Sequence, residues 1–145
     1  ALSNNFSLAH MIEPVWPGCE SSSNEDFRKF LKKKNIPLFP WSSQARGFFL
    51  EDTSERKSYH PTDPNSDEQK RVWHSEENLM KRDRCFAMAK EKGFEPIEIA
   101  LAYVLNQDFQ VFPLIGPRNL LETESSVNSL KVELTKEEMK WLDLN

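Results

Sequence analysis

The chain has 145 residues, of which 38% are hydrophobic and 29% charged, and its formal net charge is -4. This length supports one domain with a buried core. The acidic balance argues against a nucleic-acid partner, because phosphate contacts need a basic surface. No apolar run approaches the roughly 20 residues that span a bilayer, so no membrane partner is expected either.

Neither the first residues nor the cysteines indicate export. Ala1 to Asn5 contains no basic segment followed by an apolar one, so it does not resemble a signal peptide. The absence of an initiator Met favours a start inside a longer product. Cys19 and Cys85 lie far apart with no Cys/His neighbourhood, which argues against a structural zinc site. Free thiols in a reducing compartment are the better interpretation, and we expect a cytoplasmic protein.

The first predicted helix is followed by a strand. Residues 21–24 supply capping side chains ahead of two acids, and apolar residues at helical spacing then lead to a run of three lysines. Acids suit the first turn of a helix and cations suit its last turn. This pattern predicts a helix from Glu25 to Lys34, with Asn35 as its cap. Ile36 to Trp41 is a short apolar run of strand length.

The rest of the chain combines a long loop with helices. Residues 42–65 are rich in polar, glycine and proline residues, and a loop of that length is usually functional or disordered. The elements expected after it are helical turns near Ser66, a helix from Ser75 to Lys92, a helix that Pro96 begins, a strand from Phe109 to Ile115, a helix from Asn119 to Leu130, and a short last helix opened by a Thr135–Glu138 capping box. Strands that alternate with helices predict an α/β fold with a parallel sheet, open or closed.

Residues 111–119 carry the strongest functional signal. They predict a buried strand, a tight Gly116-Pro117 turn and then a helix that opens beside Arg118. Free backbone N–H groups at a helix N-terminus, together with a guanidinium, favour a phosphate. Because nucleotide cofactors lie at the C-terminal ends of parallel strands, we expect a cofactor site here.

A second candidate site lies where the predicted strand ends at Trp41. The indole can present a flat face to an aromatic ring, and the following hydroxyls and Arg46 can bind phosphate or ribose. The alternative is that Trp41 packs in a core and Arg46 is solvated, and residue chemistry alone leaves both open. A Rossmann fingerprint cannot be built from the glycines present, and the histidines show no metal-ligand spacing, so no metal is expected.

Residues 36–47, 95–105 and 111–119 resemble the C-terminal half of an aldo/keto reductase. That family forms a (β/α)8 barrel and uses a nicotinamide cofactor, usually NADPH, to reduce carbonyl compounds. The resemblance implies that residues 1–145 are the C-terminal portion of an NADP-dependent oxidoreductase domain. The implied fold class is α/β, a partial (β/α)8 TIM barrel with roughly its last three strand–helix units.

The resemblance also implies which residues hold the cofactor. Trp41 would stack on the nicotinamide, and Ser42 would begin the pyrophosphate loop. The other implied contacts are Asn4 and Asn5 at the carboxamide, Gly47 and Phe48 in the pyrophosphate loop, Gly116, Pro117, Arg118 and Asn119 near the adenosine 2'-phosphate, and Ser125 and Ser126 where the family often has Glu-Asn at the adenine. The charge of Arg118 favours NADP, while the two serines leave NAD possible.

The family's catalytic tetrad of Asp, Tyr, Lys and His lies on the first half of the barrel, where Tyr gives a proton to the carbonyl oxygen as hydride arrives. This chain has Tyr59 in the long loop and Tyr103 in a packed helix, and neither matches. A barrel of this type needs about 250 residues, so we expect a missing N-terminal half or another chain to complete it. The expected function is the cofactor-binding half of a reductase that acts on a small aldehyde or ketone, with the chain alone inactive. The alternative is a non-catalytic, reductase-like structural or regulatory subunit.

Overall fold

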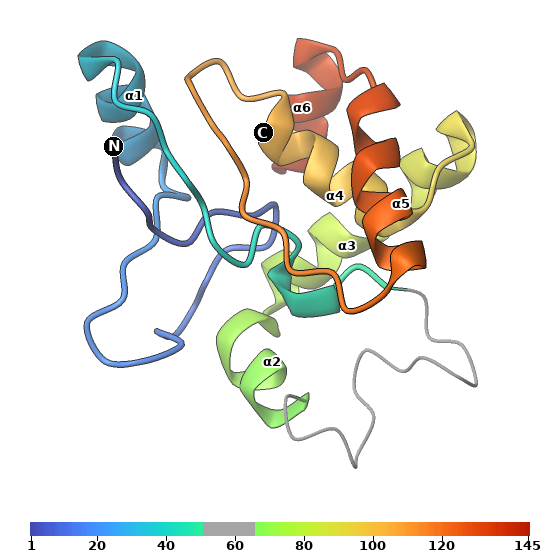
Figure 1. Cartoon of the computed structure of the whole chain (residues 1–145), viewed down its shortest axis with the longest axis horizontal. Helices are drawn as coiled ribbons and strands as arrows, with labels where there is room; N and C mark the ends of the chain where they lie inside the picture. Colours follow the sequence, from blue (N-terminus) through green and yellow to red (C-terminus); the bar gives the residue numbers. More distant parts are fainter. Residues whose placement is uncertain (51–65) are drawn as a thin grey trace.

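Short helices and irregular segments make up the described part of the chain, which comprises residues 1–50 and 66–145 of a computed structural model (Figure 1). The α-helices are α1 (Glu25–Lys34), α2 (Ser66–Trp73), α3 (Glu76–Lys92), α4 (Pro96–Leu105), α5 (Leu120–Asn128) and α6 (Lys136–Leu142), and 3-10 turns cover Ala45–Gly47 and Ser129–Lys131. Much of the predicted loop at 42–65, including Tyr59, lies outside the described residues. None of the described helices is long and apolar enough to cross a membrane.

Parallel pairing is present, but without regular strands. Within residues 1–50 and 66–145 no continuous strand forms, so the two predicted strands are wrong as regular elements. Isolated parallel bridges take their place, joining Leu2 to Leu38, Asn5 to Ser21, Asn5 to Trp41, and Leu38 to Val111. Pro37 and Pro40 explain the difference, because each lacks the N–H that a continuous ladder needs. Three parallel segments, residues 2–5, 38–41 and 111–114, therefore lie side by side with few bonds between them.

The two faces of the three parallel segments differ in exposure. Leu38 is buried, whereas the next residue, Phe39, is exposed and stacks on Phe112 with ring centroids 5.1 Å apart. The N–H groups of Phe112 and Leu114 both donate toward the neighbouring segment, at 2.8 and 2.9 Å. Successive residues of an extended chain point these groups to opposite edges, so the nitrogen of Pro113 lies toward the open edge. One face joins the core and the other stays exposed and apolar.

Capping residues explain why α1 forms where it was predicted. The Asn24 side chain accepts a hydrogen bond from the Phe27 N–H at 2.7 Å, acids occupy the first turn and lysines the last. Asn35 ends the helix with a φ of 50°, a left-handed conformation that Asn tolerates better than most residues. The predicted helix from Glu25 to Lys34 is confirmed.

Helix α3 matches its predicted span apart from its cap, and α4 begins at the predicted Pro96. Ser75 caps α3, and Gly93, with a φ of 74°, ends it. Pro96 occupies the first turn of α4, where its missing N–H does no harm. Almost every residue of α4 is buried, as its nearly continuous apolar sequence predicts.

The last two helices differ in how well their ends were predicted. Asn119 is the N-cap of α5, so it precedes the first helical residue. The residues after Asn128 form a 3-10 turn, so α5 ends before the predicted Leu130. The reciprocal capping box of Thr135 and Glu138 begins α6 as predicted.

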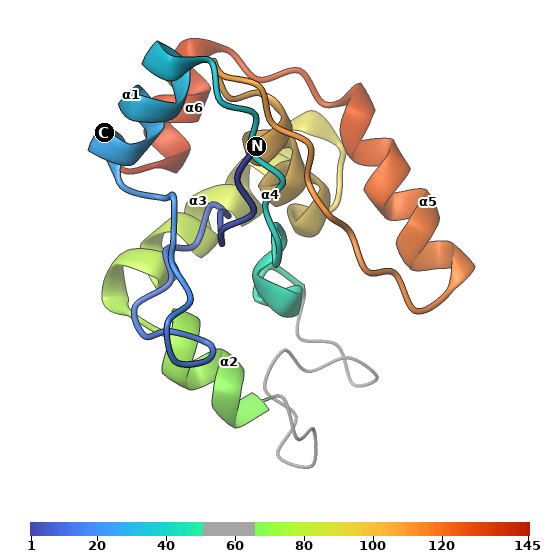
Figure 2. The same cartoon turned by 60° about the vertical axis from the view of Figure 1, so that its left-hand side comes forward.

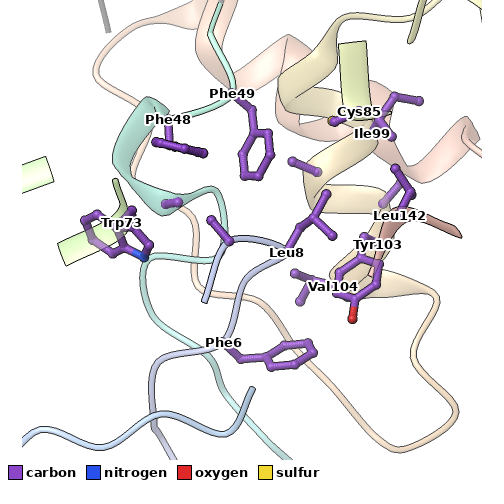
Figure 3. Close-up of a cluster of buried hydrophobic side chains, with 14 of the residues drawn as sticks. Phe6, Leu8, Phe48, Phe49, Trp73, Cys85, Ile99, Tyr103, Val104 and Leu142 are labelled. Atoms are coloured by element: carbon purple, nitrogen blue, oxygen red, sulfur yellow. The ribbon is translucent and has the colours of Figure 1, made fainter. Parts of the chain in front are cut away.

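The core lies between the three parallel segments and the helices α3 and α4 (Figure 3). Its large buried side chains include Phe6, Leu8, Phe48, Phe49, Trp73, Tyr103 and Leu142. Removing this apolar surface from water is the dominant stabilising contribution. Since Leu38, Phe48 and Phe49 all belong to the core, it fixes the segment from which the candidate site residues project.

Candidate functional site

Among the predicted cofactor residues, Asn4, Asn5, Trp41 and Ser42 lie where the parallel segments end. Because the segments are parallel, their C-terminal ends lie together at one end of the sheet. Proteins with the (β/α)8 fold carry their active sites at that end. Two side-chain hydrogen bonds connect these ends. The Asn5 amide donates to the Trp41 carbonyl at 3.4 Å, and the Ser43 hydroxyl donates to the Leu114 carbonyl at 2.9 Å.

Asn4 and Asn5 occupy different environments at this edge. Asn4 is partly exposed, and its carbonyl accepts from the Trp41 N–H at 3.2 Å. Asn5 is buried, and the Ser21 hydroxyl lies 3.4 Å from its side-chain oxygen. The Asn4 side chain is thus the more accessible of the two, whereas the Asn5 side chain is engaged within the chain.

Trp41 already has an aromatic partner. Its ring centroid lies 4.6 Å from that of Trp16, with 30° between the planes. Trp16 is 48% exposed and belongs to an irregular segment. The Arg71 guanidinium of α2 holds this segment by donating a hydrogen bond to the Pro14 carbonyl at 2.8 Å. The sequence analysis missed Trp16, because a Trp-Pro-Gly run indicates a turn and says nothing about which ring lies nearby.

The loop after Trp41 has an unusual backbone. Ser42, Ala45 and Arg46 have φ values of 50°, 47° and 49°, and Gly47 has a φ of 86°. The left-handed region disfavours a residue with a Cβ by about 1–2 kcal/mol. Such conformations persist where the surrounding structure fixes them, and they are common at binding sites.

Helices α2 and α3 fix this loop through side-chain donors. Gln69 of α2 donates to the Arg46 carbonyl at 2.9 Å. Arg82 of α3 donates to the Phe48 carbonyl at 2.9 Å and to the Leu50 carbonyl at 2.8 Å. Phe48 itself is fully buried in the core, so its backbone is the part that could meet a ligand. The sequence analysis did not identify Gln69 or Arg82.

Arg46 is paired and not simply solvated. Its guanidinium forms an ion pair with Glu68 of α2, and its Nε lies 3.4 Å from the Ser42 hydroxyl. The side chain is 36% exposed, so Arg46 is both partly solvated and paired. An anion bound at the loop would compete with Glu68 for this guanidinium.

The predicted anion site at the start of α5 is exposed and internally paired. The Arg118 side chain is 80% exposed, and Asn119 caps α5 by accepting from the Glu122 N–H at 2.9 Å. The Glu122 carboxylate accepts from the Arg118 N–H at 2.7 Å and lies 3.4 Å from its guanidinium. Gly116 and Pro117 are exposed beside it. A carboxylate of the chain itself thus engages donors that were predicted to bind phosphate.

Ser125 and Ser126 lie farther along α5, after the exposed turn at 116–119. The Ser126 side chain is buried, and its hydroxyl donates to the Glu122 carbonyl at 2.8 Å. The Ser125 hydroxyl oxygen is also buried and has no hydrogen-bond partner. Their role at an adenine stays a prediction.

A charged cluster is buried elsewhere in the core. Lys81 has no exposed side-chain surface, and its Nζ lies 3.0 Å from Asp143 Oδ1 and 2.9 Å from the His10 ring. Arg28 donates to the other carboxylate oxygen of Asp143 and to the Tyr103 hydroxyl, both at 2.9 Å. The sequence analysis did not identify this cluster, because its residues come from five separate parts of the chain.

The cluster changes two ionisation equilibria. Burial alone opposes ionisation of Asp143, but hydrogen bonding with His10 and the charges of Lys81 and Arg28 lower the pKa of this carboxyl well below its ordinary value. Burial raises the pKa of the Tyr103 phenol far above its ordinary value. A buried phenol that is bonded to Arg28 is a structural group and not a proton donor for the candidate site.

The described residues include no metal-ligand group and no disulfide. Across residues 1–50 and 66–145, no group of His, Cys, Asp or Glu is arranged to hold a metal ion. Cys19 and Cys85 are free, and burial raises the pKa of the Cys85 thiol, which keeps it unreactive.

Comparison with solved structures shows the fold. A thermostable aldo-keto reductase, crystallised with the inhibitor epalrestat, superposes with a TM-score of 0.62 at 16% sequence identity. The match covers 98% of this chain and 38% of that one. The parallel segments and helices of this chain therefore have the fold of a part of that reductase structure.

Sequence comparison shows the family. Norsolorinic acid reductase A of Aspergillus parasiticus is 27% identical over 97% of this chain and 35% of its own length. A putative aryl-alcohol dehydrogenase of Saccharomyces cerevisiae is 26% identical over 97% of this chain and 51% of its own length. The chain thus spans between a third and a half of the curated relatives it matches. The model of the aldo/keto reductase family matches residues 2–144, and the chain belongs to that family.

Proposed function

We propose that this chain provides the nicotinamide-binding part of an NAD(P)H-dependent aldo/keto reductase that acts on a small aldehyde or ketone. The observation that carries the proposal is the convergence of Asn4, Trp41 and the strained loop at 42–47 at the C-terminal ends of the parallel segments. Those ends form the ligand-binding face of (β/α)8 enzymes. Trp41 offers a flat face to a ring, and the loop backbone with Arg46 suits phosphate groups.

Within this proposal the residues of the chain position the cofactor, which supplies hydride when bound. Trp41 orients the nicotinamide ring, Asn4 binds its carboxamide, and the 42–47 loop binds the pyrophosphate. The proton donor comes from the part of the reductase that this chain does not cover, because Tyr103 is buried in the charged cluster. A missing N-terminal half, or another chain in the cytoplasm, completes the barrel.

Fluorescence quenching by NADPH tests the proposal on the chain joined to the remaining part of a reductase barrel. Trp41→Ala combined with Arg118→Ala should weaken NADPH binding by roughly 100-fold, or about 3 kcal/mol, because a stacking surface and a phosphate contact are both lost. Trp141→Ala is the matched control, since that indole is 40% exposed on α6 and was not assigned to the site. Equal binding by the double variant and the control, or no quenching by the completed barrel, would contradict the proposal.

The charge of Glu122 makes a second prediction about cofactor choice. Its carboxylate lies 3.4 Å from the Arg118 guanidinium and would repel a 2'-phosphate. Glu122→Gln keeps the shape and an acceptor, so the ratio of NADPH to NADH affinity should rise about 5-fold, equivalent to roughly 1 kcal/mol. Glu124→Gln removes the same charge elsewhere on α5 and should leave the ratio unchanged. Equal ratios in both variants would show that Arg118 does not face the 2'-phosphate.

A non-catalytic structural or regulatory subunit is the second candidate. Trp16 covers part of Trp41, and Glu122 engages Arg118, so groups suited to a cofactor already have partners within the chain. Such internal pairing is what a reductase-like subunit without a cofactor would show. Carbonyl reduction by the purified chain would exclude this candidate.

A further inference from the structure

Trp16 begins a tight turn in the irregular segment that precedes α1. The Cys19 N–H donates to the Trp16 carbonyl at 3.2 Å, which closes the turn around Pro17 and Gly18. Proline at the first central position and a positive φ at the second, 82° at Gly18, are typical of a type II turn. The turn fixes the backbone from which the Trp16 indole projects. We call residues 12–19 the Trp16 strap.

Helix α2 anchors the Trp16 strap, which lies against it in Figure 2. The Ile12 N–H donates to the Val72 carbonyl at 2.8 Å. The Arg71 guanidinium donates to the carbonyls of Pro14 and Val15, at 2.8 and 3.2 Å. The backbone immediately before the turn is therefore bonded to consecutive residues of α2.

Helix α2 also holds the strained loop that follows Trp41. Gln69 donates to the Arg46 carbonyl at 2.9 Å, and Glu68 forms an ion pair with the Arg46 guanidinium. The strap and the loop therefore share one support, which fixes the position of Trp16 relative to Trp41. A strap held in this way is poorly suited to open as a lid, because opening would break its bonds to α2.

The spacing of the two indoles decides where a cofactor ring can stack. The centroids of Trp16 and Trp41 are 4.6 Å apart, with 30° between the planes, which is the spacing of two aromatic rings in direct contact. A third ring does not fit between them. Trp41 is half-buried, so part of its indole stays accessible beside the contact with Trp16. A nicotinamide would stack there and would not displace Trp16.

We propose that Trp16 is a positioning residue, which holds the Trp41 indole in the orientation that stacks on the nicotinamide. It acts through Trp41 and makes no contact with the cofactor. An indole that is already ordered loses less side-chain freedom when a ligand arrives, so the cofactor binds more tightly. The inference rests on the proposed function, because it takes the nicotinamide and its place on Trp41 from that proposal.

Circular dichroism of the chain alone tests the indole pair without a cofactor. Two stacked indoles couple their far-ultraviolet transitions, which gives a pair of bands of opposite sign. Trp16→Ala and Trp41→Ala should each abolish these bands, whereas Trp141→Ala should keep them, because Trp141 lies on α6 outside the pair. Arg71→Ala should weaken the bands while both indoles remain, because the strap loses part of its anchor. Absence of the bands from the wild-type chain would overturn the proposal.

Calorimetric titration with NADPH tests the positioning role on the chain joined to the remaining part of a reductase barrel. Trp16→Ala should weaken binding about 5-fold, the effect of losing one aromatic pair. Trp16→Phe should keep the affinity within about 2-fold of the wild type, because a phenyl ring still stacks on Trp41. In a Trp41→Ala background, Trp16→Ala should have no further effect, since the indole through which it acts is gone. Trp141→Ala is again the control and should bind as the wild type does.

The titration separates the positioning role from the proposed function. Unchanged NADPH binding by Trp16→Ala would overturn the positioning role and leave the proposed function standing. Stronger binding would also overturn it, because Trp16 would then block the surface that the nicotinamide needs. A loss that persists in the Trp41→Ala background would overturn it in favour of a direct contact between Trp16 and the cofactor. No binding by the wild-type barrel would refute the proposed function, and the positioning role with it.

Discussion

Replacing Asp143 by alanine is expected to destabilise the chain by about 3–5 kcal/mol, the usual effect of removing one partner of a buried ion pair. The Asp143 carboxylate lies 3.0 Å from Lys81 and 2.9 Å from Arg28, and Lys81 has no exposed side-chain surface. Glu77 Oε1 also lies 3.0 Å from Lys81 Nζ, but the Glu77 side chain is 57% exposed, so it compensates only weakly for the loss of the buried carboxylate. Urea unfolding followed by circular dichroism measures the change.

A surface pair provides the control for Asp143→Ala. Asp108 pairs with Lys32, but both side chains are well exposed. Asp108→Ala should therefore change the free energy of unfolding by less than about 1 kcal/mol. Lys81→Met combined with Asp143→Leu should be less destabilising than Asp143→Ala, because it leaves fewer unpaired charges buried. Equal effects of Asp143→Ala and Asp108→Ala would show that the buried cluster does not stabilise the fold.

The cluster also gives stability a defined dependence on pH. The pKa of Asp143 is lower in the folded chain than its ordinary value of 3.8, so its contribution is present above that pH and is lost as pH falls below it. The pKa values of Cys85 and Tyr103 are raised by burial above their ordinary 9.0 and 10.0, so stability falls as the unfolded chain ionises above those values. The unfolding free energy should be greatest between these limits. Asp143→Ala should flatten the acid side of the profile.

Gln69→Leu should loosen the strained loop and weaken cofactor binding together. Gln69 is buried and donates to the Arg46 carbonyl at 2.9 Å, beside residues with left-handed backbones. Leucine keeps the volume but leaves that carbonyl without its donor, which costs about 1–3 kcal/mol. Amide hydrogen exchange at residues 45–48 should accelerate, and NADPH binding by the completed barrel should weaken about 10-fold.

The control for Gln69→Leu removes an equivalent bond elsewhere. Gln107 donates to the Tyr103 carbonyl at 2.9 Å, at the end of α4. Gln107→Leu should leave both exchange at residues 45–48 and NADPH binding unchanged. If Gln69→Leu speeds exchange without affecting binding, the loop is braced as described but does not contact the cofactor. If it does neither, α2 does not determine the loop conformation.

Local signals in the sequence predicted the helices well, whereas the paired strands were overestimated. Asn24, Gly93 and Pro96 act through the backbone of their own turns, so their effect can be recognised from neighbouring residues alone. The strand predictions rested on apolar runs, but pairing also needs N–H donors that Pro37 and Pro40 lack.

The contacts that define the site could not be predicted from one sequence. Trp16 on Trp41, Gln69 on the loop and Glu122 on Arg118 are pairings that only the fold or the turn geometry brings about. Residue chemistry indicated what Trp41 and Arg118 can bind. It could not indicate which other side chains contact them first.

Pro113 has a consequence for the behaviour of the chain before it meets its partner. An open parallel edge flanked by aromatic side chains is a template on which identical molecules can add strands without limit. A strand of a second molecule would receive no hydrogen bond from Pro113, because the proline nitrogen that faces the open edge carries no hydrogen. A continuous ladder of intermolecular bonds therefore cannot extend along this edge. A missing donor on an open edge of this kind disfavours fibrillar aggregation.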